Sequence, residues 1–391
     1  MRKLSKQFAG WLLTLVMVLT MVPLVGTPVY ADAPTGYESY TEWTNGNSLP
    51  TEAGDYYLTQ DVTFSGTWTV PSGAAINLCL NDHVITGAIS VERYGTLDLY
   101  DCNNTTERRY NIDSDLHRGV IADDGEYSFT GGYITNSNGG GVVAHGNFNM
   151  HGGTIFGCNG NGVELINGYG VFGQLNMDGG NIIGNGNGGI RANAGQSAVN
   201  ISGNSLVKHN YANNGGGIFA QTLTISGGTI SENTAESGGG GIFTQGDVNI
   251  QNATISGNHS KGTGGNNGGG GVLCTGNLTM TNVTITGNDS TFLGGGVFCT
   301  KNLTMTDVTI TGNKASSGGG GICEFPGKTV ALNGNMQITG NTNTAGTESS
   351  NLYFFSNSSA TGGITIGSGL DTDASIGVSY NSNVQVVSSA F

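Results

Sequence analysis

Basic residues are scarce in this chain. Lys and Arg together number 13 of 391 residues, against 27 Asp and Glu, and the formal net charge is −14 at pH 7. Nucleic acids and anionic membranes are bound mainly through clusters of basic side chains. The composition therefore predicts no nucleic-acid partner, and it disfavours binding to an anionic membrane surface.

Long apolar runs are also absent after the first 31 residues. Before that point a basic region at residues 2–6 precedes an apolar stretch at 11–25 and a small-residue cleavage site at 29–31, an order typical of a secretory signal peptide. The alternative is an uncleaved membrane anchor, which the prolines after the apolar stretch disfavour. We expect cleavage near Ala31, a secreted or cell-surface location, and no membrane insertion once the signal is removed, because no later segment could span a bilayer.

Charged residues make up only 10% of the chain, whereas glycine accounts for 70 residues. Glycine recurs in runs at fixed positions, and an asparagine closes a short T/N/Q-I-x-x-N motif about every 25 residues. These asparagines are Asn185, Asn233, Asn258, Asn288, Asn313 and Asn341. A fixed period of this size is typical of stacked supersecondary units.

Each repeat begins with an apolar/polar alternation of period two, which predicts a strand with one buried face. In the repeat from Leu278, Leu278 and Met280 point inward, and short strands follow around Ile285 and Val297. Stacking such coils pairs every strand in parallel with its neighbours. We predict an all-β, single-stranded parallel β-helix (solenoid) with about 25 residues and three short strands per coil. The predicted coil starts are Leu78, Leu97, Tyr127, Phe148, Leu175, Val199, Leu223, Val248, Leu278, Leu303 and Val330.

The repeats also divide the chain. Residues 1–31 are the signal peptide, 32–56 an N-terminal cap, 57–345 the β-helix, and 346–391 a C-terminal coil or cap, or a truncated junction. A cap is expected because an open β-edge invites aggregation. The most charged segment of the mature chain, 103–126, is interpreted as an irregular loop that leaves the helix.

The asparagine column is interpreted as a structural ladder. At an inner turn, each side chain would bond backbone groups of the next coil and so satisfy donors that a tight turn leaves unpaired. The alternative is an exposed ladder that binds a ligand. Cys158 and His209 interrupt the column, so we expect a weaker ladder in the first third of the helix.

Motifs such as Gly227-Gly-Thr-Ile-Ser-Glu-Asn233 and Gly238-Gly-Gly-Gly-Ile-Phe243 resemble the repeats of secreted or surface right-handed parallel β-helix proteins of Gram-positive bacteria. The resemblance covers about residues 56–380. The motifs are more distantly similar to the repeats of polymorphic outer-membrane proteins. The resemblance implies a right-handed, pectate-lyase-like β-helix and an adhesin-like or carbohydrate-contacting role.

The same fold hosts pectate lyases and polygalacturonases, so a polysaccharide lyase or glycoside hydrolase is the alternative function. The weak catalytic candidates are Asp123, Asp124 and His145, which are similar to polygalacturonase motifs but wrongly spaced, and His151 with Asp178, which share an outward column on adjacent coils. The sequence has no basic cluster to neutralise a uronate. We interpret the loop acids as solvated charges and the His151–Asp178 pair as a surface contact.

Six cysteines in a secreted chain suggest disulfides. Cys79 with Cys102, and Cys274 with Cys299, lie one coil apart and are the candidate pairs. For Cys274 and Cys299 the alternative is a role as buried apolar fillers. Cys323 is one position out of register and is expected to point outward.

The six histidines show no metal-ligand spacing, and no cofactor motif is found. We therefore predict no metal and no cofactor. Calcium is the alternative, because Asp113-Ser-Asp115 and Asp371-Thr-Asp373 each place two carboxylates close together.

We predict a secreted, adhesin-like surface protein that presents a rigid β-helix to an extracellular glycan or to a host or matrix surface. Variable loops leave one edge of the coils, and loops on a rigid scaffold commonly carry recognition. The predicted contacts are His259, Lys261, Asn266, Phe292 and Leu293. A minor alternative is ice binding through outward Thr-x-Thr rows.

Overall fold

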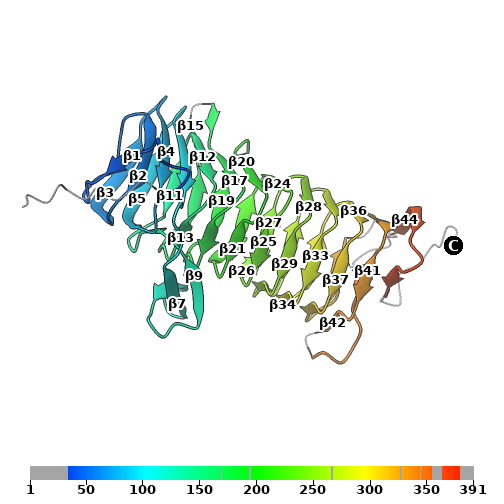
Figure 1. The fold of residues 1–391 in the computed structure, drawn as a ribbon. Helices are drawn as coiled ribbons and strands as arrows, with labels where there is room; N and C mark the ends of the chain where they lie inside the picture. Colours follow the sequence, from blue (N-terminus) through cyan, green and yellow to red (C-terminus); the bar gives the residue numbers. More distant parts are fainter. Residues whose placement is uncertain are drawn as a thin grey trace, which may run out of the picture. The chain divides into compact units, whose positions relative to one another are not determined.

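The computed structural model describes residues 34–168, 170–192, 195–265, 267–325, 328–343, 345–354 and 363–378. Within these ranges every regular element is a strand, and the strands stack as a parallel β-solenoid of about 11 turns with roughly 25 residues per turn (Figure 1). The predicted all-β solenoid is confirmed. The predicted signal peptide lies outside the described residues. Among the residues described, none forms a helix long and apolar enough to cross a membrane.

One face of every coil belongs to a 13-stranded sheet in which all neighbours are parallel. Its inward residues alternate with outward ones, as in β32, where Leu278 and Met280 are buried and Thr279 is exposed. The predicted coil starts Leu97 and those from Phe148 onward lie in this sheet in register, whereas Leu78 lies opposite Leu99, two residues out of register. Its strands, in spatial order, are β1 (Thr41–Trp43), β2 (Gly54–Leu58), β4 (Ala75–Cys79), β6 (Thr96–Tyr100), β12 (Asn147–Met150), β17 (Gln174–Met177), β20 (Ala198–Ile201), β24 (Thr222–Ile225), β28 (Val248–Gln251), β32 (Leu278–Thr281), β36 (Leu303–Thr306), β40 (Thr329–Gly334) and β44 (Gly363–Leu370).

Two further stacks complete the wall of the solenoid, and they meet at β5, which pairs with both β10 and β11. The first contains β3 (Val62–Val70), β5 (Val84–Val91), β10 (Tyr133–Thr135), β13 (Thr154–Phe156), β18 (Asn181–Ile183), β21 (Leu206–Lys208), β25 (Thr229–Ser231), β29 (Thr254–Ser256), β33 (Thr284–Thr286), β37 (Thr309–Thr311), β41 (Gln337–Thr339) and β45 (Ser375–Ile376). The second contains β11 (Val142–Ala144), β14 (Val163–Leu165), β19 (Ile190–Ala192), β23 (Ile218–Ala220), β27 (Ile242–Thr244), β31 (Val272–Cys274), β35 (Val297–Cys299), β39 (Ile322–Glu324) and β43 (Leu352–Phe354).

Six coils carry a fourth short strand where the sequence predicted only a loop. Parallel pairing of successive coils brings equivalent loop residues within hydrogen-bonding distance, so even two residues join the ladder. This six-stranded sheet consists of β22 (Tyr211–Asn214), β26 (Thr234–Gly238), β30 (His259–Ser260), β34 (Asp289–Ser290), β38 (Lys314–Ala315) and β42 (Thr342–Asn343).

The charged segment that was predicted as an irregular loop is instead a small antiparallel sheet, labelled in Figure 1 by β7 and β9. It consists of β7 (Glu107–Asp113), β8 (Arg118–Ile121) and β9 (Tyr127–Thr130). The predicted coil start at Tyr127 is therefore wrong, because β9 pairs with β7 and the coil of β6 is followed directly by that of β12. We call residues 107–130 the excursion. A second, two-stranded hairpin joins β15 (Asn167–Gly168) to β16 (Val171–Phe172).

Buried asparagines form a continuous row along the inner turn of successive coils. The backbone N–H and the Nδ2 of each donate to Oδ1 of the next, as Asn233 does to Asn258 at 3.0 Å in both bonds. Each Nδ2 also donates to a carbonyl of the preceding coil, Ile230 O in the case of Asn258. The predicted asparagines are all fully buried in this row, and Asn210 and Asn351 join them.

The sequence suggests that His209 interrupts this row, but the structure shows that it does not. Asn210 occupies the rung, bonding Asn185 on one side and Asn233 on the other. His209 adopts a φ of 55° and turns outward beside it. At Cys158 the backbone N–H still donates to Asn185 Oδ1 at 3.1 Å. The glycine runs pack against the same row, since a Cβ on Gly241 would lie 2.9 Å from Asn258 Cγ.

The cysteines fall into three environments. Cys79 and Cys102 form a disulfide. Cys274 and Cys299 are in register inside the core and are free thiols, and Cys158 is a further free thiol in the same core. Cys323 lies on the outer side of its strand, yet it is fully buried, because it packs in a second apolar cluster outside the main core.

The carboxyl group of Glu324 lies inside the solenoid. Glu324 is in register with Cys299, its side chain is fully buried, and neither carboxyl oxygen has a hydrogen-bond partner within the described residues. Burial raises the pKa of Glu324 from 4.5 to about 11, and the neighbouring Cys299 contributes in the same direction. Glu324 is therefore a neutral carboxylic acid in the folded protein.

Replacing a rung of the asparagine row should destabilise the solenoid strongly. In Asn258→Ala the buried N–H of Asn233 loses its acceptor, and an unsatisfied buried donor costs about 1–3 kcal/mol in addition to the bonds lost. We expect the free energy of unfolding to fall by about 3 kcal/mol, measured by urea denaturation. Asn249→Ala is the matched control, because Asn249 lies in the same coil and is exposed. Equal effects of the two substitutions would contradict this role of the row.

Glu324 should make the protein less stable as the pH rises. The folded pKa is raised, so the stabilising contribution of the protonated group is complete below about pH 4.5 and is lost progressively above it. We expect Glu324→Gln to reduce the loss of stability between roughly pH 5 and pH 8, measured as urea midpoints. The exposed Glu348→Gln serves as control. An unchanged pH slope in Glu324→Gln would refute this assignment.

Candidate functional site

Aromatic and acidic side chains gather on the outer face of the 13-stranded sheet near its first strands. They project from the turn before β1 and from β2, β6 and the ends of β12 and β17. We call this group the His151 cluster; it comprises Tyr37, Tyr40, Asp55, Asp98, Tyr100, His151 and Asp178. The register of the sheet brings them together, because β6, β12 and β17 are consecutive neighbours.

His151 lies at the centre of the cluster, between two carboxylates. Its Nδ1 is 2.7 Å from Asp178 Oδ1, and its Nε2 is 3.3 Å from Asp98 Oδ1. The ring stacks on Tyr100, with centroids 4.7 Å apart and planes inclined by 19°. The contact predicted between His151 and Asp178 is therefore present in the structure, and Asp98 is a partner that the sequence did not reveal.

Tyrosines form the rest of the cluster. The ring of Tyr37 packs edge-on against Tyr40 and Tyr100, at centroid distances of 4.8 and 6.0 Å. Burial raises the pKa of Tyr100, and the nearby Asp98 raises it further. The pKa of Tyr40 rises to about 12, through burial first and then through Tyr100 and Asp55. The hydroxyls therefore remain protonated donors within a negatively charged neighbourhood.

A row of amides continues from the cluster along the same outward column. Asn149 Nδ2 donates to Asp98 Oδ1 at 2.9 Å, Asn176 donates to Asn149 at 2.8 Å, and Asn200 donates to Asn176 at 2.9 Å. We call this row the outer amide row. It gives the face a line of neutral hydrogen-bonding groups that repeats from coil to coil.

The other catalytic candidates do not join the cluster. Asp123 and Asp124 are exposed in the turn between β8 and β9. His145 follows β11, where its backbone N–H bonds Val91 O. The excursion packs against the coil of His209 rather than against His145 or His151, since Tyr110 on β7 bonds His209.

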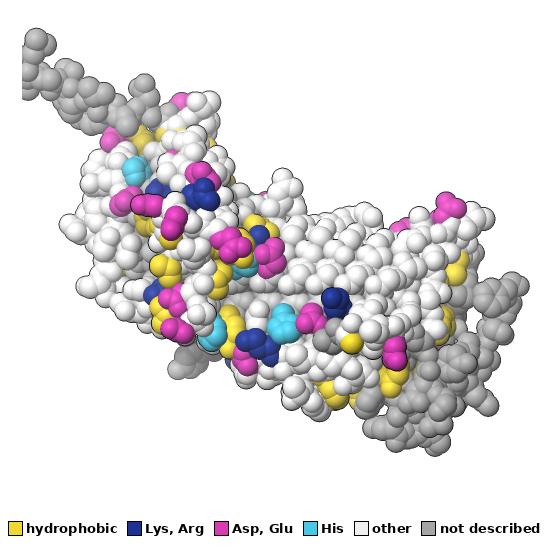
Figure 2. Space-filling view, turned by 90° about the horizontal axis from the view of Figure 1, so that it is seen from below, with side chains coloured by type: hydrophobic (Ala, Val, Ile, Leu, Met, Phe, Trp, Pro, Cys, Tyr) yellow, Lys and Arg dark blue, Asp and Glu magenta, His cyan; other side chains and the backbone are white. Residues whose placement is uncertain are grey.

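A cavity of about 310 Å³ lies where the excursion meets the coils, and we call it the excursion pocket. It is lined by Ile112, His117, Tyr127, His209, Asn210, Tyr211, Glu232, Thr234 and Lys261. Seen from below, acidic, basic and histidine side chains gather along one band of the surface, whereas neutral side chains cover most of the rest (Figure 2).

The inner wall of this pocket is a chain of hydrogen bonds. Tyr110 is buried and its hydroxyl is 2.9 Å from His209 Nδ1, while His209 Nε2 contacts Glu232. Burial lowers the pKa of His209, although Glu232 opposes the shift. Burial alone would raise the pKa of Glu232, but His209 and Lys208, whose Nζ is 3.2 Å away, outweigh it and hold the pKa below its usual value.

The outer wall is built by side chains of the six-stranded sheet and the excursion. The rings of His117 and Tyr211 stack at 3.9 Å with planes 10° apart. Glu236 Oε1 accepts hydrogen bonds from Tyr211, at 2.5 Å, and from Lys261 Nζ, at 2.8 Å. Both bonds lower the pKa of Glu236, that from Lys261 most.

The loop residues predicted as ligand contacts have mixed placements. His259 Nδ1 is 3.2 Å from Asp289, and Lys261 lines the excursion pocket. Leu293 is 1% exposed in the outer apolar cluster, and Phe292 packs beside it. Leu293 therefore cannot be a ligand contact, because its loop folds back over apolar side chains on the outer faces of β31 and β35. Asn266 lies outside the described residues.

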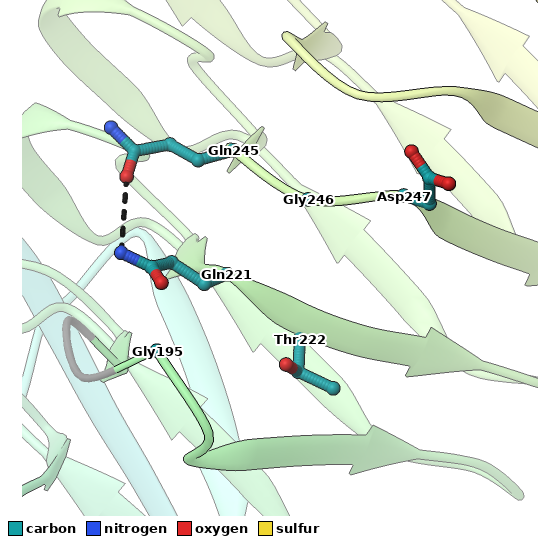
Figure 3. A pocket seen from close by; sticks show the side chains of 6 residues that line it. All are labelled: Gly195, Gln221, Thr222, Gln245, Gly246 and Asp247. Atoms are coloured by element: carbon teal, nitrogen blue, oxygen red, sulfur yellow. Dashed lines mark hydrogen bonds between the residues drawn. The ribbon is translucent and has the colours of Figure 1, made fainter.

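A larger hollow of about 580 Å³ opens beside the turns that precede β24 and β28. Figure 3 shows its side chains, Gln221, Thr222, Gln245 and Asp247, with Gln221 Nε2 donating to Gln245 Oε1 at 3.3 Å. Of its lining residues, Asp247 alone is ionisable. The hollow offers hydrogen bonds but no pair of acid and base.

Among the described residues, no group of three or more His, Cys, Asp or Glu side chains is arranged to hold a metal ion. Asp113 Oδ1 instead accepts the N–H groups of Asp115 and Leu116 and closes a turn. Asp373 uses its carbonyl to accept a bond from Gln337.

Comparison with known proteins gives no relative from which to transfer a function: no family model, no curated protein and no solved structure matches the chain. The solenoid itself is compatible with an adhesin and with a polysaccharide-active protein. The choice between these two functions depends on the His151 cluster and the excursion pocket.

Proposed function

We propose that this is a secreted or cell-surface protein that binds the chains of a neutral glycan on the outer face of the 13-stranded sheet. The observation that carries the proposal is the His151 cluster, where aromatic rings and carboxylates meet on one open face. Asp178 is 58% exposed and His151 is 29% exposed. A face this open suits a long ligand that passes across it better than a small one that must be enclosed.

The chemistry of the cluster matches that of a sugar. Pyranose rings have apolar C–H faces that pack on aromatic rings, and their hydroxyls donate strong hydrogen bonds to carboxylates. The stacked Tyr100 and His151 supply the aromatic surface, and Asp98 and Asp178 supply the acceptors beside it. The outer amide row offers further donors and acceptors to later units of the chain.

Charge restricts the kind of glycan. Asp98, Asp178 and Asp55 all act on the hydroxyl of Tyr100 and raise its pKa. This negative potential repels uronates and sulfated sugars, which are themselves anionic. Neutral glycans are therefore the class that the face accepts best.

Hydrolysis of the bound glycan is the second candidate, and one observation favours it. Asp98 and Asp178 lie on opposite nitrogens of one imidazole ring. Their separation is the width of that ring plus two hydrogen bonds, which is on the scale of the roughly 6.5–9.5 Å spacing of inverting glycosidases. Binding is preferred because His151 occupies the space between the carboxylates where the attacking water would stand.

Binding should depend on the stacked pair at the centre of the cluster. We expect the full secreted chain to bind neutral glycans on an array, and Tyr100→Ala and His151→Ala to weaken binding at least about tenfold, or 1.4 kcal/mol, by isothermal titration. Tyr94→Ala is the matched control, because Tyr94 is 71% exposed and lies outside the cluster. An array with no bound neutral glycan, or a Tyr100→Ala variant that binds as well as the parent, would reject the proposal.

Turnover separates binding from hydrolysis. If the protein only binds, the glycan identified on the array should release no reducing ends during prolonged incubation. If it hydrolyses the glycan, Asp98→Asn and Asp178→Asn should each lower the rate by about 10²–10⁴ while leaving the affinity within a few-fold. Release of reducing ends that both variants abolish would establish the second candidate instead.

A further inference from the structure

We propose that the excursion pocket is a second sugar site, which takes one neutral pyranose unit such as the end of a glycan chain. Its volume of about 310 Å³ falls near the lower limit of the roughly 300–1,000 Å³ typical of small-molecule sites. Its residues come from the excursion, from the turns that follow β21 and β25, and from the six-stranded sheet and the residue after β30. None belongs to the His151 cluster. The inference does not depend on the function proposed for that cluster.

The pocket lies between two parts of the chain, the excursion and the coils. Tyr110, Phe129, Phe156 and Ile183 form an apolar cluster that anchors the excursion to the coils. Gly119 N–H also donates to Gly184 O at 2.8 Å. The two walls are therefore fixed before a ligand arrives, and a preformed site loses little entropy on binding.

Lys261, which lines the pocket, and Glu236, which bonds to the lining residues Lys261 and Tyr211, keep unused hydrogen-bonding capacity. Lys261 donates one of its three N–H bonds to Glu236 Oε1, and that ion pair is about two-fifths exposed on both sides. A carboxylate has two oxygens that can accept about four bonds, and an ammonium has three donors. One sugar hydroxyl can therefore donate to Glu236 while its oxygen accepts from Lys261.

Glu232, which lines the pocket, forms a second pair of this kind with Lys208. Its carboxylate is 44% exposed and lies beside Lys208. The pKa of Glu232 is lowered by His209 and Lys208, and that of Glu236 by Lys261 and Tyr211, so both glutamates are ionised at neutral pH. The two pairs each supply an acceptor and a donor, as the hydroxyls of a pyranose require.

The same features disfavour other small ligands. A phosphate or a carboxylate would have to compete with Glu232 and Glu236 for Lys208 and Lys261, which these carboxylates already neutralise. An apolar ligand would bury these ion pairs without offering them hydrogen bonds, which is costly. The flat His117–Tyr211 stack beside the pairs gives the C–H edge of a sugar a surface to contact.

Saturation-transfer NMR on the full chain tests this site with the methyl glycosides of glucose, galactose, mannose and N-acetylglucosamine as probes. We expect at least one probe to receive saturation, with a dissociation constant on the order of 1 mM, as for a ligand of about a dozen atoms held mainly by hydrogen bonds. Glu236→Gln and Lys261→Met should each weaken that probe at least about fivefold, because each removes one member of the pair.

Two controls separate this site from the His151 cluster and from loss of fold. Lys301→Met, an exposed lysine outside the pocket, should leave the probe affinity and the unfolding midpoint unchanged. Tyr100→Ala should leave the monosaccharide signal intact even where it abolishes binding of long glycans. No saturation of any probe, or loss of the signal in Tyr100→Ala but not in Lys261→Met, would overturn the proposal.

Discussion

From Asn185 onward, the coils of this protein satisfy the polar backbone groups of a tight inner turn that is closed off from water by means of the asparagine row. The row runs from Asn185 to Asn351 with each amide both donating and accepting. An amide is suited to this task because one side chain carries a donor and an acceptor at once. Since each bond links one coil to the next, the row also fixes the register of the strands on every other face.

Much of this architecture could be predicted from the sequence, because the row and the inward apolar residues recur with one period. The predictions were wrong where the period was broken by structure that pairs locally. Tyr127 has the alternation of a coil start, yet its strand pairs with β7 inside the excursion. His209 was mistaken for a rung for another reason, a misalignment by one residue. The register of β18 with β21 places His209 opposite Gly184, both with positive φ, and Asn210 opposite Asn185.

The candidate site was hidden for the same reason. His151 and Asp178 were paired from sequence because their coils follow each other in the chain. Asp98 is 53 residues from His151 in sequence, because the excursion is inserted between two coils that are neighbours in space. Leu293 was mistaken for a contact because an apolar loop residue looks exposed until the outward apolar side chains that it covers are known.

Register also explains why charge is confined to so little of the surface. Residues in one outward column face each other on adjacent coils, where like charges repel. In the column of His259, Asp289 and Lys314, the acidic residue lies between the two basic ones. Glu164 likewise lies opposite Arg191. Asn, Thr and Ser fill most of the other outward positions.

The His151 cluster departs from this pattern, because three carboxylates act on one tyrosine and no ion pair to Lys or Arg is found for them among the described residues. Asn77 lies between Asp55 and Asp98 in the column and donates to Asp55 at 2.5 Å, which reduces the repulsion but does not remove it. In the other outward columns, charged residues are separated or paired. Keeping these three carboxylates together therefore costs the folded protein stability. Such a cost is typical of residues that are kept for a ligand rather than for the fold.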